Sequence, residues 1–292
     1  MENILHTIDK ETALPSVTVP RPPCFDLDQI FDCGQSFRFT KVPDGAYEGI
    51  AYGRAVRFYQ TATALSIVNC TEDEYNTVWR AYFALDTDYP AIRAELLRRS
   101  GDDAVLRQAM ACGEGIRILR QEPWETLCTF ILSQNNNIPR IRGLIAALSA
   151  RWGTPVKLGE KILYTFPPPD AFLSAGVDEL FALKTGFRAK YLYDAAENVS
   201  AGAIDFDRIR RADFDDAMEQ LCTIRGVGPK VAACVLLFAF GKTEAFPIDV
   251  WIKKALSAYY PEGLDIAMLG KYAGIAQQYL FYYTRNLQKE HQ

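Results

Sequence analysis

One lysine and one aspartate in this chain could together carry nucleophilic chemistry on a carbon atom. Lys230 stands two residues after the tripeptide Gly226-Val227-Gly228, just inside the N-terminus of a predicted helix, and Asp249 follows nineteen residues later. The positive end of a helix dipole and burial against an apolar run both disfavour an ammonium ion, so both favour a neutral amine that attacks carbon. Asp249 directly precedes another predicted helix, where it could cap that helix and also face a developing positive charge.

The tripeptide before Lys230 predicts a hairpin between two helices. Gly226 and Gly228 permit a tight turn with positive φ and leave backbone amides bare. Bare amides at a helix N-terminus bind a phosphate oxygen, so Gly226, Val227, Gly228 and Lys230 are candidate contacts to nucleic-acid phosphates. Taken alone, the tripeptide would also fit an ordinary corner between helices, and a single lysine would fit a solvated surface charge. The combination with a downstream Asp249 is more specific than either part.

The other reactive side chains exclude several chemistries. Only two histidines occur, His6 and His291, both close to the chain ends, which argues against a Ser-His-Asp triad, a Cys-His nucleophile or a His-ligated metal. The seven cysteines are irregularly spaced and include no Cys-x-x-Cys pair, so we predict no metal site. Their odd number fits reduced and mostly buried thiols.

Composition and charge set the class of protein. The 292 residues are 49% hydrophobic and 23% charged, which is typical of a globular protein with a large core. The longest apolar run, 231–240, is about half of a membrane span, and no secretory, mitochondrial or nuclear targeting signal is visible. We therefore expect a protein of a prokaryotic cytoplasm that acts at the nucleoid and has no membrane partner. The net charge of −4 counts mildly against nucleic acid, but the basic segment 138–161 leaves room for a local basic face.

These side chains need a scaffold, and the sequence predicts an α+β one. We expect an N-terminal arm or edge strand over 1–24, an antiparallel sheet domain over 25–115 and a helical helix–hairpin–helix domain over 116–292. Alternation around Val56 and Ile67 predicts strands, with a turn at Gly53-Arg54. Asp170 is expected to cap a short helix, and the stretch before it is expected to be irregular. Helical spacing covers 74–85, 91–110, 123–131, 140–151, 177–183, 189–202, 213–224, 229–239, 250–258 and 270–287.

The segment 221–254 resembles the helix–hairpin–helix, Gly/Pro-rich, aspartate signature of DNA glycosylases in its lysine-bearing form. Within that superfamily the chain is most similar to the 8-oxoguanine DNA glycosylases, from about residue 25 to 285. The further segments that carry this resemblance are Gly34-Gln35-Ser36-Phe37-Arg38, Gly115-Ile116-Arg117-Ile118-Leu119-Arg120-Gln121, Ser133-Gln134-Asn135-Asn136-Asn137-Ile138, Gly186-Phe187-Arg188-Ala189-Lys190-Tyr191 and Gly274-Ile275-Ala276-Gln277-Gln278-Tyr279-Leu280-Phe281.

The resemblance implies roles at the reacting nucleotide. Lys230 matches the Schiff-base lysine, Asp249 matches the catalytic aspartate, and Gly34 matches the glycine whose carbonyl accepts the N7–H of 8-oxoguanine. Three more residues match positions around the damaged base: Cys234, Phe281 and Gln277. The first two match the faces that sandwich the base, and the third matches the contact to its Watson–Crick edge. A core position for Phe281 and a plain hairpin role for Gly34 would also fit.

The resemblance also implies how the opposite strand is held once the base has been flipped out of the duplex. Asn135 matches the asparagine that takes the place of the flipped base, and Arg140 and Arg188 match the arginines that bind the orphaned cytosine. An Asn with two Arg can satisfy the two acceptors and one donor on that edge. Phe187 matches the aromatic wedge in the stack. A helix cap would equally fit the asparagines.

We therefore expect a monomeric, bifunctional glycosylase and lyase acting on duplex DNA with 8-oxoguanine opposite cytosine, and no cofactor beyond a monovalent cation that the family resemblance allows at the hairpin. One departure from the family pattern is Trp251, which stands where a phosphate-binding histidine is common. Two alternatives stay open: a glycosylase of the same fold for another damaged base, and a non-catalytic helix–hairpin–helix DNA-binding protein. The four-cysteine cluster of some relatives is absent after Cys234.

Overall fold

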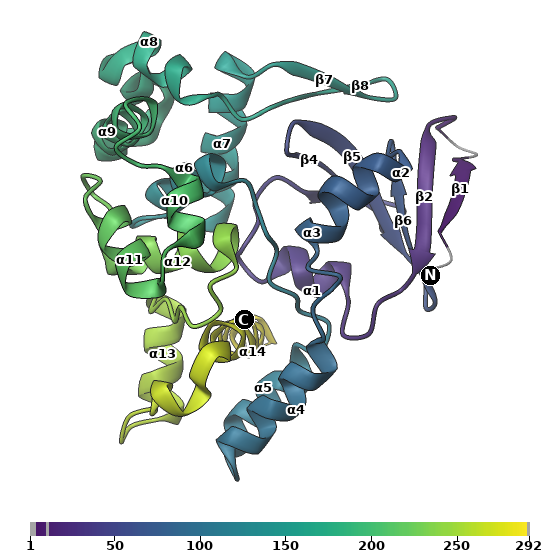
Figure 1. The fold of residues 1–292 in the computed structure, drawn as a ribbon, viewed down its shortest axis with the longest axis vertical. Helices are drawn as coiled ribbons and strands as arrows, with labels where there is room; N and C mark the ends of the chain where they lie inside the picture. Colours follow the sequence, from purple (N-terminus) through teal and green to yellow (C-terminus); the bar gives the residue numbers. More distant parts are fainter. Residues whose placement is uncertain (1–3, 10–11, 291–292) are drawn as a thin grey trace.

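The computed structural model describes residues 4–9 and 12–290 and divides them between a sheet and a larger set of helices (Figure 1). His291 and parts of the expected arm, residues 1–3 and 10–11, lie outside the described residues. The α+β class is confirmed. Among the described residues, no helix is long and apolar enough to cross a membrane.

The sheet is antiparallel and six-stranded, in the order β1-β2-β6-β5-β4-β3. Its strands are β1 (Leu5–Ile8), β2 (Pro15–Pro20), β3 (Thr40–Lys41), β4 (Tyr47–Ala51), β5 (Arg54–Gln60) and β6 (Ala64–Val68). Both strands predicted from alternation are present, and Phe58 lies opposite Ile67 with both fully buried, although β6 is buried on both faces. The turn that joins β4 to β5 is Tyr52-Gly53, both with positive φ, one residue earlier than the predicted Gly53-Arg54.

The remaining chain is mostly helical. The helices are α1 (Leu27–Asp32), α2 (Glu72–Glu74), α3 (Arg80–Tyr82), α4 (Tyr89–Ser100), α5 (Ala104–Cys112), α6 (Pro123–Leu132), α7 (Ile138–Trp152), α8 (Pro169–Leu180), α9 (Ala189–Ser200), α10 (Phe206–Arg211), α11 (Phe214–Cys222), α12 (Pro229–Phe240), α13 (Val250–Tyr259) and α14 (Ala273–Glu290). Short irregular turns add η1 (Tyr75–Trp79), η2 (Phe181–Thr185), η3 (Gly186–Arg188) and η4 (Ile266–Tyr272).

Several local expectations were wrong. The stretch 91–110 is two helices, because Gly101 adopts φ +55° and Asp103 caps α5. Asp170 is not a cap, since α8 begins one residue earlier at Pro169. The stretch expected to be irregular holds a second, two-stranded sheet, β7 (Pro155–Leu158) with β8 (Lys161–Tyr164), and α10 lies where no helix was predicted.

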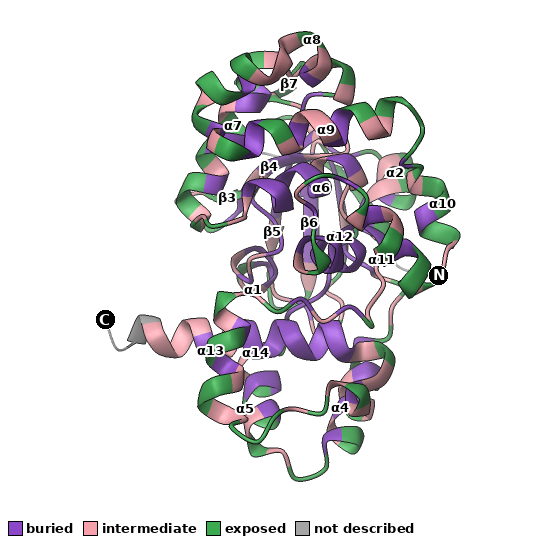
Figure 2. Ribbon diagram, turned by 90° about the vertical axis from the view of Figure 1, so that its left-hand side faces the viewer, coloured by how far each residue is buried: buried purple, intermediate pink, exposed green. Residues whose placement is uncertain are grey.

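Packing divides the chain differently from the boundaries that we expected at residues 24 and 115. The expected arm or edge strand contributes two strands: β1 is an edge strand of the sheet, and β2 lies inside it between β1 and β6. Helices α4 and α5 come before residue 115, yet Leu96 and Leu106 belong to the helical core and α5 packs on α14. The long buried stretch of α14 beside these helices is visible in Figure 2.

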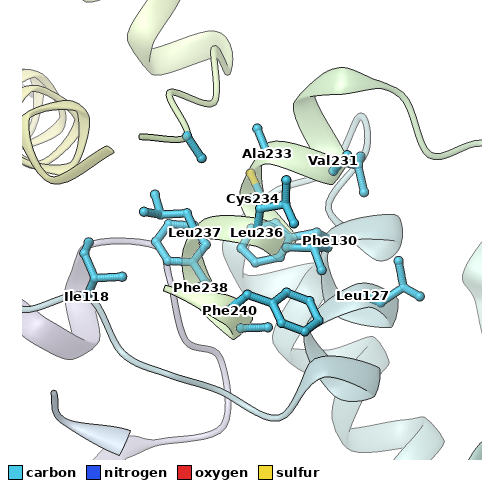
Figure 3. Packing of buried hydrophobic residues seen from close by; sticks show 14 of the residues in the cluster. Ile118, Leu127, Phe130, Val231, Ala233, Cys234, Leu236, Leu237, Phe238 and Phe240 are labelled. Atoms are coloured by element: carbon cyan, nitrogen blue, oxygen red, sulfur yellow. The ribbon is translucent and has the colours of Figure 1, made fainter. Parts of the chain in front are cut away.

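The core of the helical part positions the chemistry because α12 runs through it. Every residue of α12 from Val231 to Phe240 is buried, and its side chains meet α6, with Phe130 and Phe238 stacked at a centroid distance of 5.3 Å (Figure 3). A helix that is apolar on all sides is stable only when it is covered all round. The start of α12 is therefore fixed, and Lys230 projects from a rigid base.

Buried polar groups tie the sheet side to the helical side. The amide of Gln35 donates to Arg117 O over 2.8 Å and accepts from Leu119 N–H over 2.9 Å. The guanidinium of Arg117, 1% exposed, donates to Pro23 O and Ala84 O over 2.8 Å each. Because such groups cost free energy when they lose their partners, this network fixes the loop that carries Gly34.

Candidate functional site

The predicted hairpin joins α11 to α12, but only Gly226 has the expected positive φ, since Gly228 is extended at φ −100°. Gly226 has φ +80°, and a Cβ there would lie 2.3 Å from the ring of Tyr191, so only glycine fits this turn. Val227 is buried, and its N–H donates to Ile224 O over 3.0 Å. Gly228 occupies the N-cap position of α12 without a side-chain hydrogen bond, and a Cβ there would meet no described atom within 4 Å. The amide end of α12 is therefore uncovered by side chains.

Lys230 and Asp249 line the same cleft, which has a volume of about 850 Å³. The cleft lies between the loop after α6, the first turns of α12 and α13, and α14. Lys230 Nζ is 3.3 Å from Ser133 Oγ and 5.7 Å from the ring centroid of Phe130. Since the Ser133 hydroxyl donates to Phe130 O over 2.8 Å, its oxygen is left to accept from the lysine. The amine is thus held by one acceptor at the wall of the cleft.

Asp249 has the double position that the sequence suggested. Its carboxylate accepts from Ile252 N–H over 2.8 Å and so caps α13, and it also faces the cleft. Burial raises the pKa of Asp249 above its usual value, while the Ile252 amide and the charge of Lys230 act in the opposite direction. Burial raises the pKa of the nearby Cys234 thiol to about 11, again with Lys230 opposing. The Asp249 carboxyl group therefore faces the cleft from a poorly solvated position, close enough to the Lys230 charge to feel its electrostatic effect.

Two of the four predicted lesion-base residues form a narrow wall of this cleft. Gly34 has φ +76°, and a Cβ there would lie 2.8 Å from Phe281 Cζ, so the backbone and the ring approach closely. Both residues line the cleft. Cys234 and Gln277 are buried and lie outside the set of lining residues. The side-chain amide of Gln277 donates to Pro247 O over 3.1 Å, so it is occupied within the protein.

The residues predicted for the opposite strand surround the loop after α6. Asn135 is exposed with φ +46° and lines the cleft. Arg188 is 3% exposed, and its guanidinium donates to Gln134 O and Asn135 O over 2.9 Å each. Phe187 is 50% exposed, with its ring centroid 4.4 Å from the Arg188 guanidinium. Arg188 thus supports the backbone of Asn135 instead of projecting freely.

Arg140 lies at the rim of the cleft, between the lining residues Pro139 and Ile141. It is exposed at the start of α7, and its guanidinium donates to Lys184 O over 3.4 Å. It is not among the residues that line the cleft. The structure brings Lys230, Asp249 and Asn135 together and leaves Arg140 at the rim.

Comparison with known proteins identifies the family. The model of the 8-oxoguanine DNA glycosylase N-terminal domain matches residues 17–127, and that of the HhH-GPD superfamily base excision DNA repair proteins matches residues 128–263. The N-glycosylase/DNA lyase of Saccharomyces cerevisiae is 35% identical over 266 residues, which cover 80% of this chain and 68% of the yeast protein.

Solved structures agree over almost the whole chain. MBOgg1 in complex with a low affinity DNA ligand is 39% identical, with a TM-score of 0.91 and 99% of each chain covered. The Clostridium acetobutylicum 8-oxoguanine glycosylase/lyase, in complex with double-stranded DNA containing cytosine opposite 8-oxoguanine, is 37% identical, with a TM-score of 0.90 and 98% of each chain covered. The chain belongs to the 8-oxoguanine DNA glycosylase family. The prediction of a DNA glycosylase with lyase activity in base excision repair is confirmed.

Within this family scaffold, sequence reasoning missed four polar residues at the cleft: Ser133, Lys253, Lys254 and Arg285. Ser133 opens the motif that contains Asn135, so its place beside the asparagine was a usable signal. The two lysines follow Asp249 by about one helical turn, which was a second signal. Nothing local in the sequence predicts that Arg285, on α14, reaches the same cleft.

Proposed function

We propose that this enzyme excises 8-oxoguanine opposite cytosine from duplex DNA with Lys230 as the nucleophile. The observation that carries the proposal is that the Lys230 amine and the Asp249 carboxylate line one cleft, whose wall includes the close pair Gly34 and Phe281. A flipped purine that enters this cleft meets a flat ring on one side and a backbone carbonyl segment on the other. The matched structure from Clostridium acetobutylicum supports this choice of substrate.

The proposed reaction uses two groups of this chain. Lys230 Nζ attacks C1′ of the flipped nucleotide, the C1′–N9 bond breaks, and the bonding electrons leave with the base, which takes up a proton. Asp249 stabilises the positive charge that develops on the sugar. The nitrogen, now bonded to C1′, loses one proton. The C1′–O4′ bond then breaks while O4′ takes up a proton, which opens the sugar ring and gives a protonated Schiff base. Loss of a proton from C2′ then breaks the C3′–O bond, and the strand is cleaved 3′ to the lesion.

The proposed roles on the opposite strand require one rearrangement. Asn135 would fill the gap left by the flipped base, with Phe187 as the exposed wedge. Arg188 would have to release Gln134 O and Asn135 O before it binds cytosine, since its donors are occupied without DNA. A monomer that acts on chromosomal DNA in a prokaryotic cytoplasm stays our prediction.

Borohydride trapping tests the proposed function. The enzyme is incubated with a labelled duplex that contains one 8-oxoguanine opposite cytosine, and a covalent adduct is expected for the wild type and for Lys271→Gln, a variant of an exposed lysine that does not line the cleft. Lys230→Gln should give no adduct. A duplex with guanine at the same position should give none with any variant. An adduct that survives Lys230→Gln, or binding without any adduct, refutes the proposal, and the second result would favour a non-catalytic DNA-binding protein.

A further inference from the structure

The cleft carries more positive charge than the reaction at Lys230 uses. Four cationic side chains and one anionic side chain line it: Lys230, Lys253, Lys254 and Arg285, against Asp249. The chain as a whole has a net charge of −4, so this concentration of cations is local. A cleft lined by one sign of charge focuses its field on a ligand of the opposite sign.

Most other cations near the cleft or in the predicted basic segment are committed to protein partners. Arg285 pairs with Asp32 over 2.9 Å, and Arg151 pairs with Glu179 over 3.2 Å. The Arg142 guanidinium donates to Phe39 O over 2.7 Å. The basic segment 138–161 therefore offers fewer free charges than its composition suggested.

Lys253 and Lys254 differ from these cations. Both are exposed on the first turns of α13, and neither has an acidic partner within the described part of the chain. Lys254 Nζ is 4.6 Å from the ring centroid of Trp251 and 3.3 Å from Gln288 Oε1. An ammonium held over an indole face is already ordered, so it loses less side-chain freedom when a phosphate binds.

The distance of Lys253 and Lys254 from Asp249 along α13 is suited to phosphates of the strand that carries the attacked sugar. Asp249 caps α13, and four or five residues of α-helix add an axial rise of roughly 6–8 Å. A sugar placed at Lys230 and Asp249 therefore brings its neighbouring phosphates within reach of long lysine side chains on the next turn. Phosphate contacts of this kind position the strand and are independent of sequence.

We propose that Lys253 and Lys254 bind phosphates of the lesion-bearing strand beside the flipped nucleotide, with Trp251 holding the Lys254 ammonium in place. That the contacted strand is the lesion-bearing one rests on the proposed function. It makes the first turns of α13 a phosphate contact separate from the hairpin before α12.

The test is the salt dependence of DNA binding, measured in a Lys230→Gln background to prevent turnover. A fluorescein-labelled duplex with one 8-oxoguanine opposite cytosine is titrated at several KCl concentrations between about 50 and 200 mM, the range over which lost phosphate contacts are readily seen. The slope of log K against log[KCl] should become less steep by about 0.9 for each of Lys253→Gln and Lys254→Gln, and by about twice that in the double variant.

The matched control is Lys271→Gln. Lys271 is also exposed and also lies over an aromatic ring, 5.0 Å from the centroid of Tyr272, but it does not line the cleft. The Lys271→Gln substitution should leave the slope unchanged. The conservative variants Lys253→Arg and Lys254→Arg keep the positive charge and should retain the slope of the parent protein. An unchanged slope in the double glutamine variant overturns the proposal.

Trapping with Lys230 intact separates this proposal from the proposed function. If the double variant shows the reduced slope and still forms the adduct at saturating enzyme, both stand. If the slope depends on Lys253 and Lys254 but the protein with Lys230 intact forms no adduct, the proposed function fails and the phosphate contacts stand. Trp251→Leu should weaken binding about two- to fivefold, and that loss should vanish in Lys254→Gln. Equal losses in both backgrounds refute the role of Trp251.

Discussion

Glu122 should make the stability of this enzyme depend on pH in a way that one isosteric substitution removes. Glu122 directly precedes α6 and lines a cavity of about 320 Å³ between the sheet and the helical part, together with Glu125 and Arg38. Burial, with repulsion from Glu125 second, raises the pKa of Glu122 from 4.5 to about 7, although Arg38 opposes the shift. Arg38 Nε lies 3.3 Å from a carboxylate oxygen of Glu125, so the guanidinium is paired with Glu125 and not with Glu122.

The sign follows from the direction of the shift. A carboxyl group whose pKa is higher in the folded state binds protons more tightly there, so its favourable contribution is complete below pH 4.5 and is lost as the pH rises through 7. The full shift corresponds to roughly 3 kcal/mol, and partial solvation of the group reduces this to about 2 kcal/mol. Glu122→Gln keeps the shape and has no charge to desolvate. It should match the wild type at pH 4.5 and exceed it by about 2 kcal/mol at pH 8.

Chemical denaturation of both proteins at half-unit steps between these pH values gives the difference in unfolding free energy directly, because all other titrations cancel. Glu160→Gln, at an exposed turn between β7 and β8, is the control and should show a flat difference. A flat difference for Glu122→Gln as well would refute the reasoning. Such a result would mean that water or the N-terminal dipole of α6 already compensates the buried charge.

Three further substitutions test the cleft and its support. Asp249→Asn keeps a cap on α13 and removes a carboxylate whose pKa is raised by burial, so it should increase the free energy of unfolding at neutral pH, measured by denaturation, while the trapping rate falls by at least a hundredfold. Gly226→Ala adds a Cβ against the Tyr191 ring at positive φ and should destabilise the protein by about 2–4 kcal/mol; a thermal midpoint equal to that of the wild type would contradict this. Ser133→Ala removes the hydrogen bond to Lys230 and should slow adduct formation about tenfold in single-turnover trapping without changing the affinity for DNA. An unchanged rate would show that the amine needs no such support.

The chemistry-bearing elements were predictable because their signals are local. Gly226 allows the turn because it can adopt positive φ, and the apolar run after Lys230 predicts a helix covered on all sides. Asp249 is followed by helical spacing, so its cap could be expected without knowledge of the fold. Each of these inferences needs fewer than about a dozen neighbouring residues.

The rest of the site depends on contacts between distant segments. Arg285 reaches the cleft only because α14 packs between α5 and α13, and no pattern around residue 285 encodes that packing. The basic segment 138–161 misled for the same reason, since Arg151 pairs with Glu179 on α8 and Arg142 donates to Phe39 O just before β3. Charge composition predicts which ions exist in a segment, and only tertiary structure decides which of them are free.

Helix α6 connects Glu122 to the serine that holds Lys230. Glu122 stands immediately before its first turn, and Ser133, which holds Lys230, stands immediately after its last. The same helix packs on α12, so Lys230 and its acceptor are carried by two helices in mutual contact. A change in the charge of Glu122 that altered the position of α6 would therefore move Ser133 relative to the amine. Suppose that Glu122→Gln alters the pH dependence of stability but leaves the trapping rate unchanged at every pH. The position of α6 then does not respond to the charge of Glu122, and the unfavourable charge before its first turn has no effect on the chemistry at Lys230.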